Sequence, residues 1–286
     1  MATTIDNAAL FKVDGLVAVI TGGGSGLGEM MAIALASAGA KRVYIIGRRL
    51  EKLQEVASNS SHANIIVPVQ GDVTSKDSLA KVVEQVEKDV GYVNLLVVNS
   101  GMSGPSMRDV PEKPTVKQIQ EAFWSWSTED FNSVYALNNT AAFFTAAAFL
   151  NLLDVGNQAG KGPDYQTQVL FTSSLAGLSR NLSTGVAYAT SKAGTVHLAK
   201  TMATFLAPHN IRVNTLAPGI FPSEMTAGKV GASAGFSTNT IPAGRLGSEE
   251  DIRGTVLWLV SRAGAYINGM VILCDGGRLS LQPSVY

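Results

Sequence analysis

Short apolar segments and longer amphipathic segments alternate along almost the whole chain. The short segments are rich in Val, Ile and Leu, as strands buried on both faces are, whereas the longer ones repeat apolar residues at helical spacing. This alternation is typical of a parallel β-sheet covered by helices on both faces. The sequence has no internal repeat and no linker rich in Pro and Ser, so we predict that residues 1–286 form a single α/β domain.

The alternation also predicts the individual elements. The strands are expected at Leu16–Thr21, Arg42–Gly47, Asn64–Val69, Val93–Val98, Gln168–Thr172, Arg212–Leu216 and Met270–Leu273. The helices are expected at Leu27–Ala38, Leu50–Asn59, Lys76–Asp89, Thr128–Leu153, Val186–Leu206 and Glu249–Ser261, with a short extra helix in Thr115–Trp126. Two connections, residues 102–128 and 223–247, are unusually long, and such loops are commonly lids or binding loops. Both are therefore candidate walls of a substrate pocket, although the first is equally compatible with an oligomer contact or a packed surface flap.

Composition disfavours several classes of partner. The formal net charge is zero and only 15% of residues are charged, whereas nucleic-acid binding needs an excess of clustered Lys and Arg. The most apolar segment, Ala141–Leu153, is too short to span a bilayer, and residues 1–7 lack the pattern of a signal peptide. Cys274 is the only cysteine, and the three histidines lack metal-ligand spacing. We therefore expect a soluble cytoplasmic protein with no membrane, nucleic-acid or metal partner.

Glycines crowd the turn between the first predicted strand and the first predicted helix, in the segment Ile20–Gly28. Glycine lets the backbone turn sharply and lets a pyrophosphate approach it. The N–H groups and the positive dipole end of the following helix stabilise anionic oxygens. Because the turn opens a strand–helix–strand unit, we predict that it binds a dinucleotide; a merely tight turn is the alternative.

The second predicted strand ends at Gly47 and is followed by Arg48 and Arg49. A protein that prefers NAD usually has Asp or Glu here, which holds the adenosine ribose and repels a 2′-phosphate. Gly47 carries no charge, whereas the guanidinium of Arg48 can form charge-assisted hydrogen bonds with phosphate. The sequence therefore favours NADP(H), with Ser25 as an additional phosphate donor, over the alternative that both arginines are ordinary solvated residues.

Tyr188 and Lys192 are four residues apart in a predicted helix, so they lie on the same face, one turn apart. A phenol has a pKa of about 10, and an adjacent cation lowers that pKa toward neutrality. Tyr188 is therefore a candidate general acid/base. Taken alone the pair is weak evidence, because such pairs commonly just cover a helix surface.

Together these residues form a recognisable pattern. The chain contains, in order, Thr21-Gly22-x-x-x-Gly26-x-Gly28, Asp72, Asn99-Ser100-Gly101, Asn138, Ser173-Ser174-x-Ala176-Gly177, Tyr188-x-x-x-Lys192, Pro218-Gly219 and Asp275-Gly276-Gly277. In order and approximate spacing they resemble the motifs of the short-chain dehydrogenases/reductases, over nearly the whole chain. The resemblance implies a single-domain Rossmann fold with a seven-stranded parallel sheet and helices on both faces.

The resemblance also implies residue roles. Tyr188 would exchange a proton with the substrate oxygen, and Lys192 would lower the pKa of Tyr188 and hold the nicotinamide ribose. Ser174 would hydrogen-bond the substrate oxygen, and Asn138 would hold a water in the proton relay. The implied cofactor-binding residues are Gly22, Ser25, Gly26, Leu27, Gly28, Arg48, Asp72, Asn99, Lys192, Phe221 and Ser223.

Two of these assignments would move to a neighbouring residue if the alignment with the family pattern shifted by one position. Asn139 competes with Asn138, and Ser173 competes with Ser174. Ser174 is preferred because Leu175-Ala176-Gly177 then falls into the usual frame of the family. The connection 102–128 is longer than is typical, which leaves the substrate pocket the least predictable part.

The leading hypothesis is an NADPH-dependent carbonyl reductase, reversible as an alcohol dehydrogenase, that acts on a small molecule. Aromatic residues in the two long connections hint at an apolar substrate. The helices predicted at 128–153 and 186–206 resemble those that pair subunits in this family, which predicts a homodimer or homotetramer. The alternatives are reduction of an imine or enoyl group, and a non-catalytic cofactor-binding scaffold. The scaffold is disfavoured because Tyr188, Lys192 and the Gly-rich turn are all present.

Overall fold

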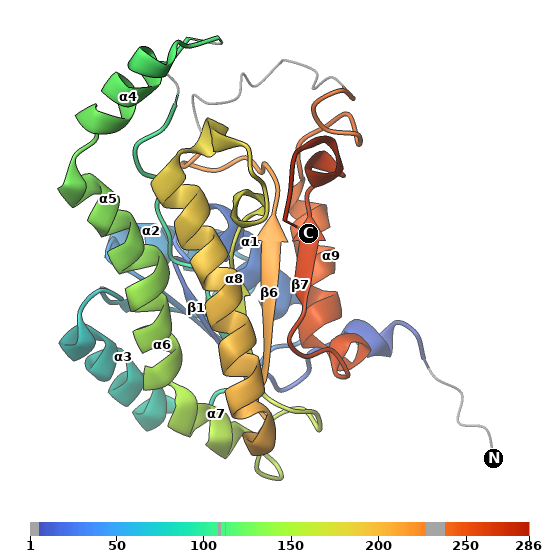
Figure 1. Ribbon diagram of the computed structural model, residues 1–286. Coiled ribbons are helices and arrows are strands. Elements are labelled where there is room, and N and C mark those ends of the chain that lie inside the picture. The colour runs from blue at the N-terminus through green and yellow to red at the C-terminus, as the bar shows by residue number, and fades with distance from the viewer. Residues whose placement is uncertain (1–5, 108–109, 112, 227–237, 286) are drawn as a thin grey trace.

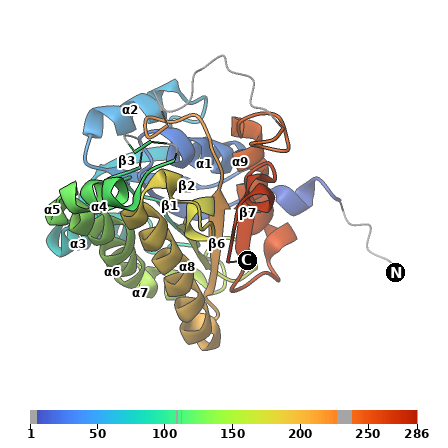
Figure 2. The same ribbon diagram turned by 45° about the horizontal axis from the view of Figure 1, so that its top comes forward.

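The central element of the structure is a parallel sheet of seven strands in the order β3-β2-β1-β4-β5-β6-β7. The structure is a computed structural model that describes residues 6–107, 110–111, 113–226 and 238–285. Helices cover both faces of the sheet (Figures 1 and 2). The predicted fold class, a Rossmann-like α/β fold with a seven-stranded parallel sheet, is confirmed.

The observed elements agree closely with those predicted. The strands are β1 (Val17–Thr21), β2 (Arg42–Gly47), β3 (Ile66–Gln70), β4 (Leu95–Val98), β5 (Gln168–Thr172), β6 (Arg212–Pro218) and β7 (Val271–Cys274). The helices are α1 (Gly26–Ser37), α2 (Leu50–Asn59), α3 (Lys76–Asp89), α4 (Val116–Ser125), α5 (Thr128–Tyr135), α6 (Ala142–Ala148), α7 (Leu150–Gly156), α8 (Val186–Leu206) and α9 (Glu249–Val260). Apart from one helix, the ends differ from the predicted ones by two residues at most.

Alternate residues of the central strand β1 serve two separate cores. Val17 and Val19 pack with α3, α6, α7 and α8 on one face of the sheet. Ala18 and Ile20 pack with α1, α2 and α9 on the other face. Because successive side chains of a strand point to opposite faces, a strand covered on both sides must be apolar throughout, as β1 is.

The single helix predicted at Thr128–Leu153 is wrong. The segment divides into α5, a π-helical turn at Ala136–Ala141, α6 and α7, and the axis bends by 47° between residues 148 and 150. Phe149 at the bend is fully buried in the core. Continuous apolar composition predicts helix throughout, but packing of Phe149 against the sheet sets the direction in which the chain continues.

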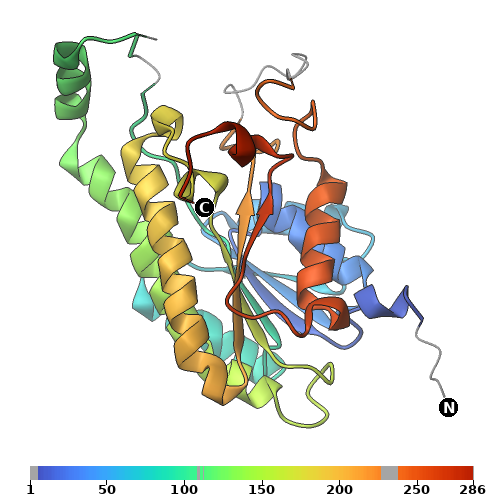
Figure 3. The same ribbon diagram turned by 45° about the vertical axis from the view of Figure 1, so that its right-hand side comes forward.

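The extra helix α4 begins with a capping box, in which Thr115 accepts from the backbone of Gln118 and Gln118 accepts from the backbone of Thr115. None of its residues is fully buried, and it lies at the outer end of α5, away from the sheet (Figures 1 and 3). The expected short helix in the connection 102–128 therefore exists, but it adds nothing to either core.

A helix that spans a membrane must be both long enough and apolar enough to cross the bilayer. Across the described ranges no single helix meets both requirements, although the bent pair Thr128–Ala148 and Leu150–Gly156 meets them jointly. Most apolar residues of this pair pack against the sheet.

Candidate active site

The Gly-rich turn is tied to the neighbouring strand β4 by side-chain hydrogen bonds. The Thr21 hydroxyl accepts from the N–H groups of Asn99 and Ser100, at 3.0 and 3.1 Å. The Asn99 amide in turn donates to the carbonyls of Thr21 and Gly22, at 3.0 and 3.3 Å. These bonds join the carboxyl ends of β1 and β4, which is the switch point where a doubly wound sheet binds its ligand.

Close packing explains why this turn needs glycine. Gly22 has φ +67°, a conformation that side chains disfavour, and a Cβ on Gly28 would lie 2.2 Å from the Gly22 carbonyl oxygen. The side chain of Ser25, which precedes α1, does not cap the helix. The turn thus brings bare backbone and the positive end of α1 together, and this cradle fits the phosphates of a dinucleotide.

Two charged residues with a predicted role in cofactor binding, Arg48 and Asp72, follow the ends of β2 and β3. The guanidinium of Arg48 is exposed and, within the described ranges, forms no hydrogen bond or ion pair. Asp72 accepts from the N–H and the hydroxyl of Thr74, at 2.9 and 2.7 Å. These bonds, aided by the charge of Arg48, hold the pKa of Asp72 below its ordinary value. Arg48 is therefore available to an anionic ligand. The side chain of Ser75 caps the start of α3.

The two serines after β5 point to different partners. The hydroxyl of Ser173 is buried and donates to the backbone carbonyl of Lys192 at 2.8 Å, which fastens β5 to α8. The hydroxyl of Ser174 accepts from the N–H of Ala176 at 3.1 Å and also interacts with the phenol of Tyr188. Of the two, Ser174 is the one that shares a site with Tyr188.

Lys192 is buried, with 4% of its surface exposed. Its ammonium donates to the carbonyl of Thr172 at 2.9 Å and lies 5.9 Å from the centre of the Tyr188 ring. Burial disfavours the charged form and lowers the pKa of Lys192 from 10.5 to about 8. The spacing of four residues therefore does bring the two side chains together, with Lys192 buried and Tyr188 partly exposed.

The pKa of the Tyr188 phenol is raised, chiefly by burial, and the interaction with Ser174 opposes that rise. The expected lowering of this pKa by Lys192 is thus not the net effect in the structure. Desolvation outweighs the cation because the phenolate would lie in a low-dielectric interior. A phenol is protonated at neutral pH even at its ordinary pKa of about 10, so Tyr188 carries the proton that a donor needs.

Asn138 lies in the π-helical turn and is 1% exposed. Its amide accepts from the N–H of Met102 at 2.9 Å and donates to the Met102 carbonyl at 3.0 Å and to the Ser191 hydroxyl at 2.9 Å. Ser191 in turn donates to the carbonyl of Tyr188 at 2.8 Å. Asn138 therefore connects the start of the 102–128 connection to the helix that carries Tyr188.

Gly101 lets this amide and the lysine approach each other. A Cβ on Gly101 would lie 3.2 Å from both the Asn138 amide oxygen and the Lys192 ammonium. The competing residue Asn139 instead donates to the backbone of Ser191 at 2.9 Å. The sequence analysis did not single out Ser191. Only its position between Tyr188 and Lys192 could have indicated that it belongs to the site.

The two residues predicted after β6 differ in exposure. The side chain of Phe221 is buried in the core that contains α1 and α9, so it packs the fold and leaves only its backbone for a ligand. Ser223 lies against the start of α1, since a Cβ on Gly26 would be 3.1 Å from it. Thr226, which the sequence did not single out, donates to the Phe221 carbonyl at 2.7 Å and accepts from the Ser223 N–H at 2.8 Å.

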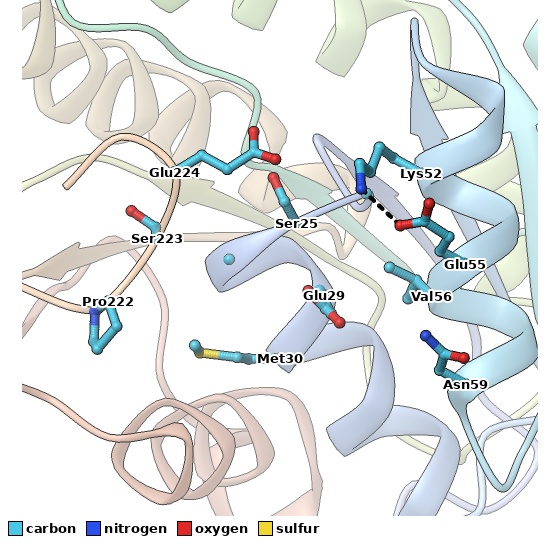
Figure 4. A pocket seen from close by; sticks show the side chains of 12 residues that line it. Ser25, Glu29, Met30, Lys52, Glu55, Val56, Asn59, Pro222, Ser223 and Glu224 are labelled. Atoms are coloured by element: carbon cyan, nitrogen blue, oxygen red, sulfur yellow. Dashed lines mark hydrogen bonds and ion pairs between the residues drawn. The ribbon is translucent and has the colours of Figure 1, made fainter. Parts of the chain in front are cut away.

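A cavity of about 370 Å³ opens beside the Gly-rich turn, between α1, α2 and the segment that follows β6 (Figure 4). Its lining includes Ser25, Glu29, Lys52, Glu55 and Glu224. Within the connection 223–247, which was predicted as a wall of the substrate pocket, residues 227–237 lie outside the described part of the chain.

Known proteins are similar to this chain in sequence and in fold. Residues 16–233 match the family described as short chain dehydrogenase. The chain is 45% identical over 284 residues, which are 98% of this chain and 96% of the relative, to the short-chain dehydrogenase/reductase PhomF of Diaporthe leptostromiformis. It is 31% identical to the 5-keto-D-gluconate 5-reductase of Escherichia coli strain K12, over 94% of this chain and 98% of that protein.

A solved structure gives the same result. The Pseudomonas aeruginosa RhlG/NADP active-site complex superimposes with a TM-score of 0.83 at 29% identity, covering 95% of this chain and 99% of that chain. With a family match over most of its length and a site at the switch point of the sheet, the chain belongs to the short-chain dehydrogenase/reductase family of oxidoreductases.

Proposed function

We propose that the protein is an NADPH-dependent carbonyl reductase that also runs in reverse as an alcohol dehydrogenase. The observation that carries the proposal is the convergence of Tyr188, Ser174 and Lys192 beside the Gly-rich turn. The nicotinamide cofactor, when bound, supplies the hydride for the carbonyl carbon. A reductase then needs a proton donor for the oxygen, and Tyr188 meets that need.

Each of the three side chains contributes a distinct effect. Tyr188 donates the proton of its phenol, whose raised pKa keeps that proton in place at neutral pH. Ser174 orients the substrate oxygen by a hydrogen bond and stabilises charge that develops on it. Lys192 holds a positive charge near the phenol, which favours the phenolate left after proton transfer. Asn138, which fixes the Met102 segment beside them, completes the proposed set.

The cofactor preference rests on Arg48. Its guanidinium is exposed just after β2, and Gly47 at the end of that strand offers no carboxylate to hold an NAD ribose. The phosphate cradle consists of Gly22, Ser25, Gly26, Leu27 and Gly28 at the start of α1. Asp72 and Asn99 follow neighbouring strands, and Phe221 and Ser223 follow β6. The similar Pseudomonas aeruginosa RhlG structure is an NADP complex, which supports the same choice, whereas two other similar structures are complexes with NADH.

A homodimer or homotetramer is proposed alongside this activity. Phe143 on α6 and Phe205 on α8 are 44% and 76% exposed, although both belong to apolar helices that cover the sheet. Contiguous apolar surface of this kind is typical of protein interaction sites, and these helices are the ones expected to pair subunits.

Two measurements test the proposal. NADPH oxidation is followed across a panel of ketones with Tyr188→Phe as the comparison, and we expect activity to fall by at least about a hundredfold because the proton donor is lost. Undiminished activity in Tyr188→Phe would remove Tyr188 from the mechanism. Separate titrations with NADPH and NADH test the role of Arg48, and tighter binding of NADH would refute it. Imine and enoyl substrates in the same panel separate carbonyl reduction from its two chemical alternatives.

A further inference from the structure

One lining residue of the cavity beside the Gly-rich turn, Glu224, forms an ion pair with Arg49. Arg49, the residue before α2, donates to both carboxylate oxygens of Glu224 at 2.8 and 3.4 Å. The two residues are 175 positions apart in the chain, and both are about half exposed. In Figure 4, Glu224 and Ser223 lie across the start of α1 from Lys52 and Glu55. The pair thus links the connection after β2 to the segment after β6.

The segment that presents Glu224 is held in place by bonds other than the ion pair. The Thr226 hydroxyl donates to the Phe221 carbonyl at 2.7 Å and accepts from the Ser223 N–H at 2.8 Å. Ser223 also packs against the start of α1, next to Gly26. Removing the charge of Glu224 therefore leaves its backbone in position and changes chiefly what Arg49 can bind.

Cations around this cavity already have carboxylate partners. Lys52 donates to Glu55 at 2.7 Å, and Arg49 donates to Glu224. Only Arg48, one residue before Arg49, has a guanidinium without a hydrogen-bonded partner among the described cations of the β2–α2 connection. Arg49 is the next residue along the chain, so both guanidinium groups belong to the connection after β2, where the 2′-phosphate is proposed to bind.

We propose that Glu224 sets the preference between NADPH and NADH by competing with the adenosine 2′-phosphate for Arg49. This inference rests on the proposed NADP(H) dependence and adds a specificity residue, Glu224, from the segment after β6. A cofactor that carries the 2′-phosphate must break or share the Arg49–Glu224 pair and meets the repulsion of its carboxylate. NADH, which lacks that phosphate, leaves the pair intact. Glu224 therefore weakens NADPH binding selectively.

Direct binding titrations test this idea without turnover. The dissociation constants of NADPH and NADH are measured for the unmodified protein and for Glu224→Gln. Exposed ion pairs are worth up to about 1 kcal/mol, so we expect NADPH to bind about three- to fivefold more tightly to the variant. NADH affinity should change less than about twofold, because both cofactors share the pyrophosphate and differ only in the 2′-phosphate.

Two further variants isolate the mechanism. Glu84→Gln removes an exposed carboxylate that pairs with Lys88 on α3, far along the chain from the cavity, and should leave both affinities unchanged. In the background Arg49→Gln, Glu224→Gln should lose its selective effect, because the contested cation is gone. Unchanged or weaker NADPH binding in Glu224→Gln, or an equal gain for NADH, would overturn the inference. Tighter binding of NADH than NADPH by the unmodified protein would instead refute the proposed cofactor.

Discussion

Replacing Lys192 with methionine is expected to remove activity and yet stabilise the folded protein. The ammonium is 4% exposed, and burial lowers the pKa of Lys192 from 10.5 to about 8. One pKa unit corresponds to about 1.4 kcal/mol, so below pH 8 the folded state carries a cost of about 3 kcal/mol for keeping this group charged. Methionine has a similar length and no charge, so it avoids that cost.

Part of this gain is offset by a lost hydrogen bond. The ammonium donates to the Thr172 carbonyl at 2.9 Å, and leaving that acceptor without a donor costs about 1 kcal/mol. The expected net stabilisation of Lys192→Met is therefore roughly 2 kcal/mol at pH 7. Lys200→Met is the matched control on the same helix, because Lys200 is exposed, and its effect should lie within about 0.5 kcal/mol of zero.

The pH dependence gives the sharper test. The unfolded chain binds the Lys192 proton up to about its ordinary pKa, whereas the folded chain releases it near pH 8. The stability of the unmodified protein therefore rises, relative to the variant, as pH increases from 8 to 10.5. Urea unfolding at fixed protein concentration, repeated across that range, measures the difference. A variant that is less stable at pH 7, or an advantage that persists unchanged above pH 10.5, would refute the assigned cost of burial.

Two further predictions concern the same site. Gly101→Ala places a Cβ 3.2 Å from both the Asn138 amide oxygen and the Lys192 ammonium, so we expect kcat to fall about tenfold and cofactor binding to weaken, because Lys192 is also expected to hold the nicotinamide ribose. Steady-state kinetics and a cofactor titration check this, and an unchanged kcat would contradict it. For the unmodified enzyme, kcat/KM of ketone reduction should decline as pH rises through about 8, because Lys192 loses its charge there. A pH–rate profile that stays flat to pH 9.5 would exclude this origin.

The arrangement of the sheet followed from the sequence because its signal is local and repeated. Each strand is a short run of apolar residues, and each crossover between parallel strands has one common handedness, so few topologies remain. The long helix at 128–153 was mispredicted for the opposite reason. An apolar sequence is equally compatible with one straight helix or with several, and burial of Phe149 in the core decides between them.

Spacing predicted that Tyr188 and Lys192 share a helical face, but it could not predict how deeply that face is buried. Desolvation depends on what covers a group, and here the cover comes from segments distant in sequence, such as Gly101. The prediction that the pKa of Tyr188 is lowered was therefore wrong, because it considered only the charge of Lys192 and not the burial of the phenol. The Arg49–Glu224 pair was invisible for the same reason, since neither residue belongs to a local pattern.

The position of Lys192 is energetically unfavourable in ways that are unusual for a residue in a protein core. Its ammonium is buried and has a single hydrogen-bonded partner among the described residues, and a Cβ on Gly101 would lie only 3.2 Å from it. A buried methionine would serve packing better, so stability alone does not account for a lysine here. Natural proteins break such local rules chiefly at functional sites. The conflict between the charge of Lys192 and its burial is thus an independent argument that this group serves chemistry, separate from the match of its motif to a family pattern.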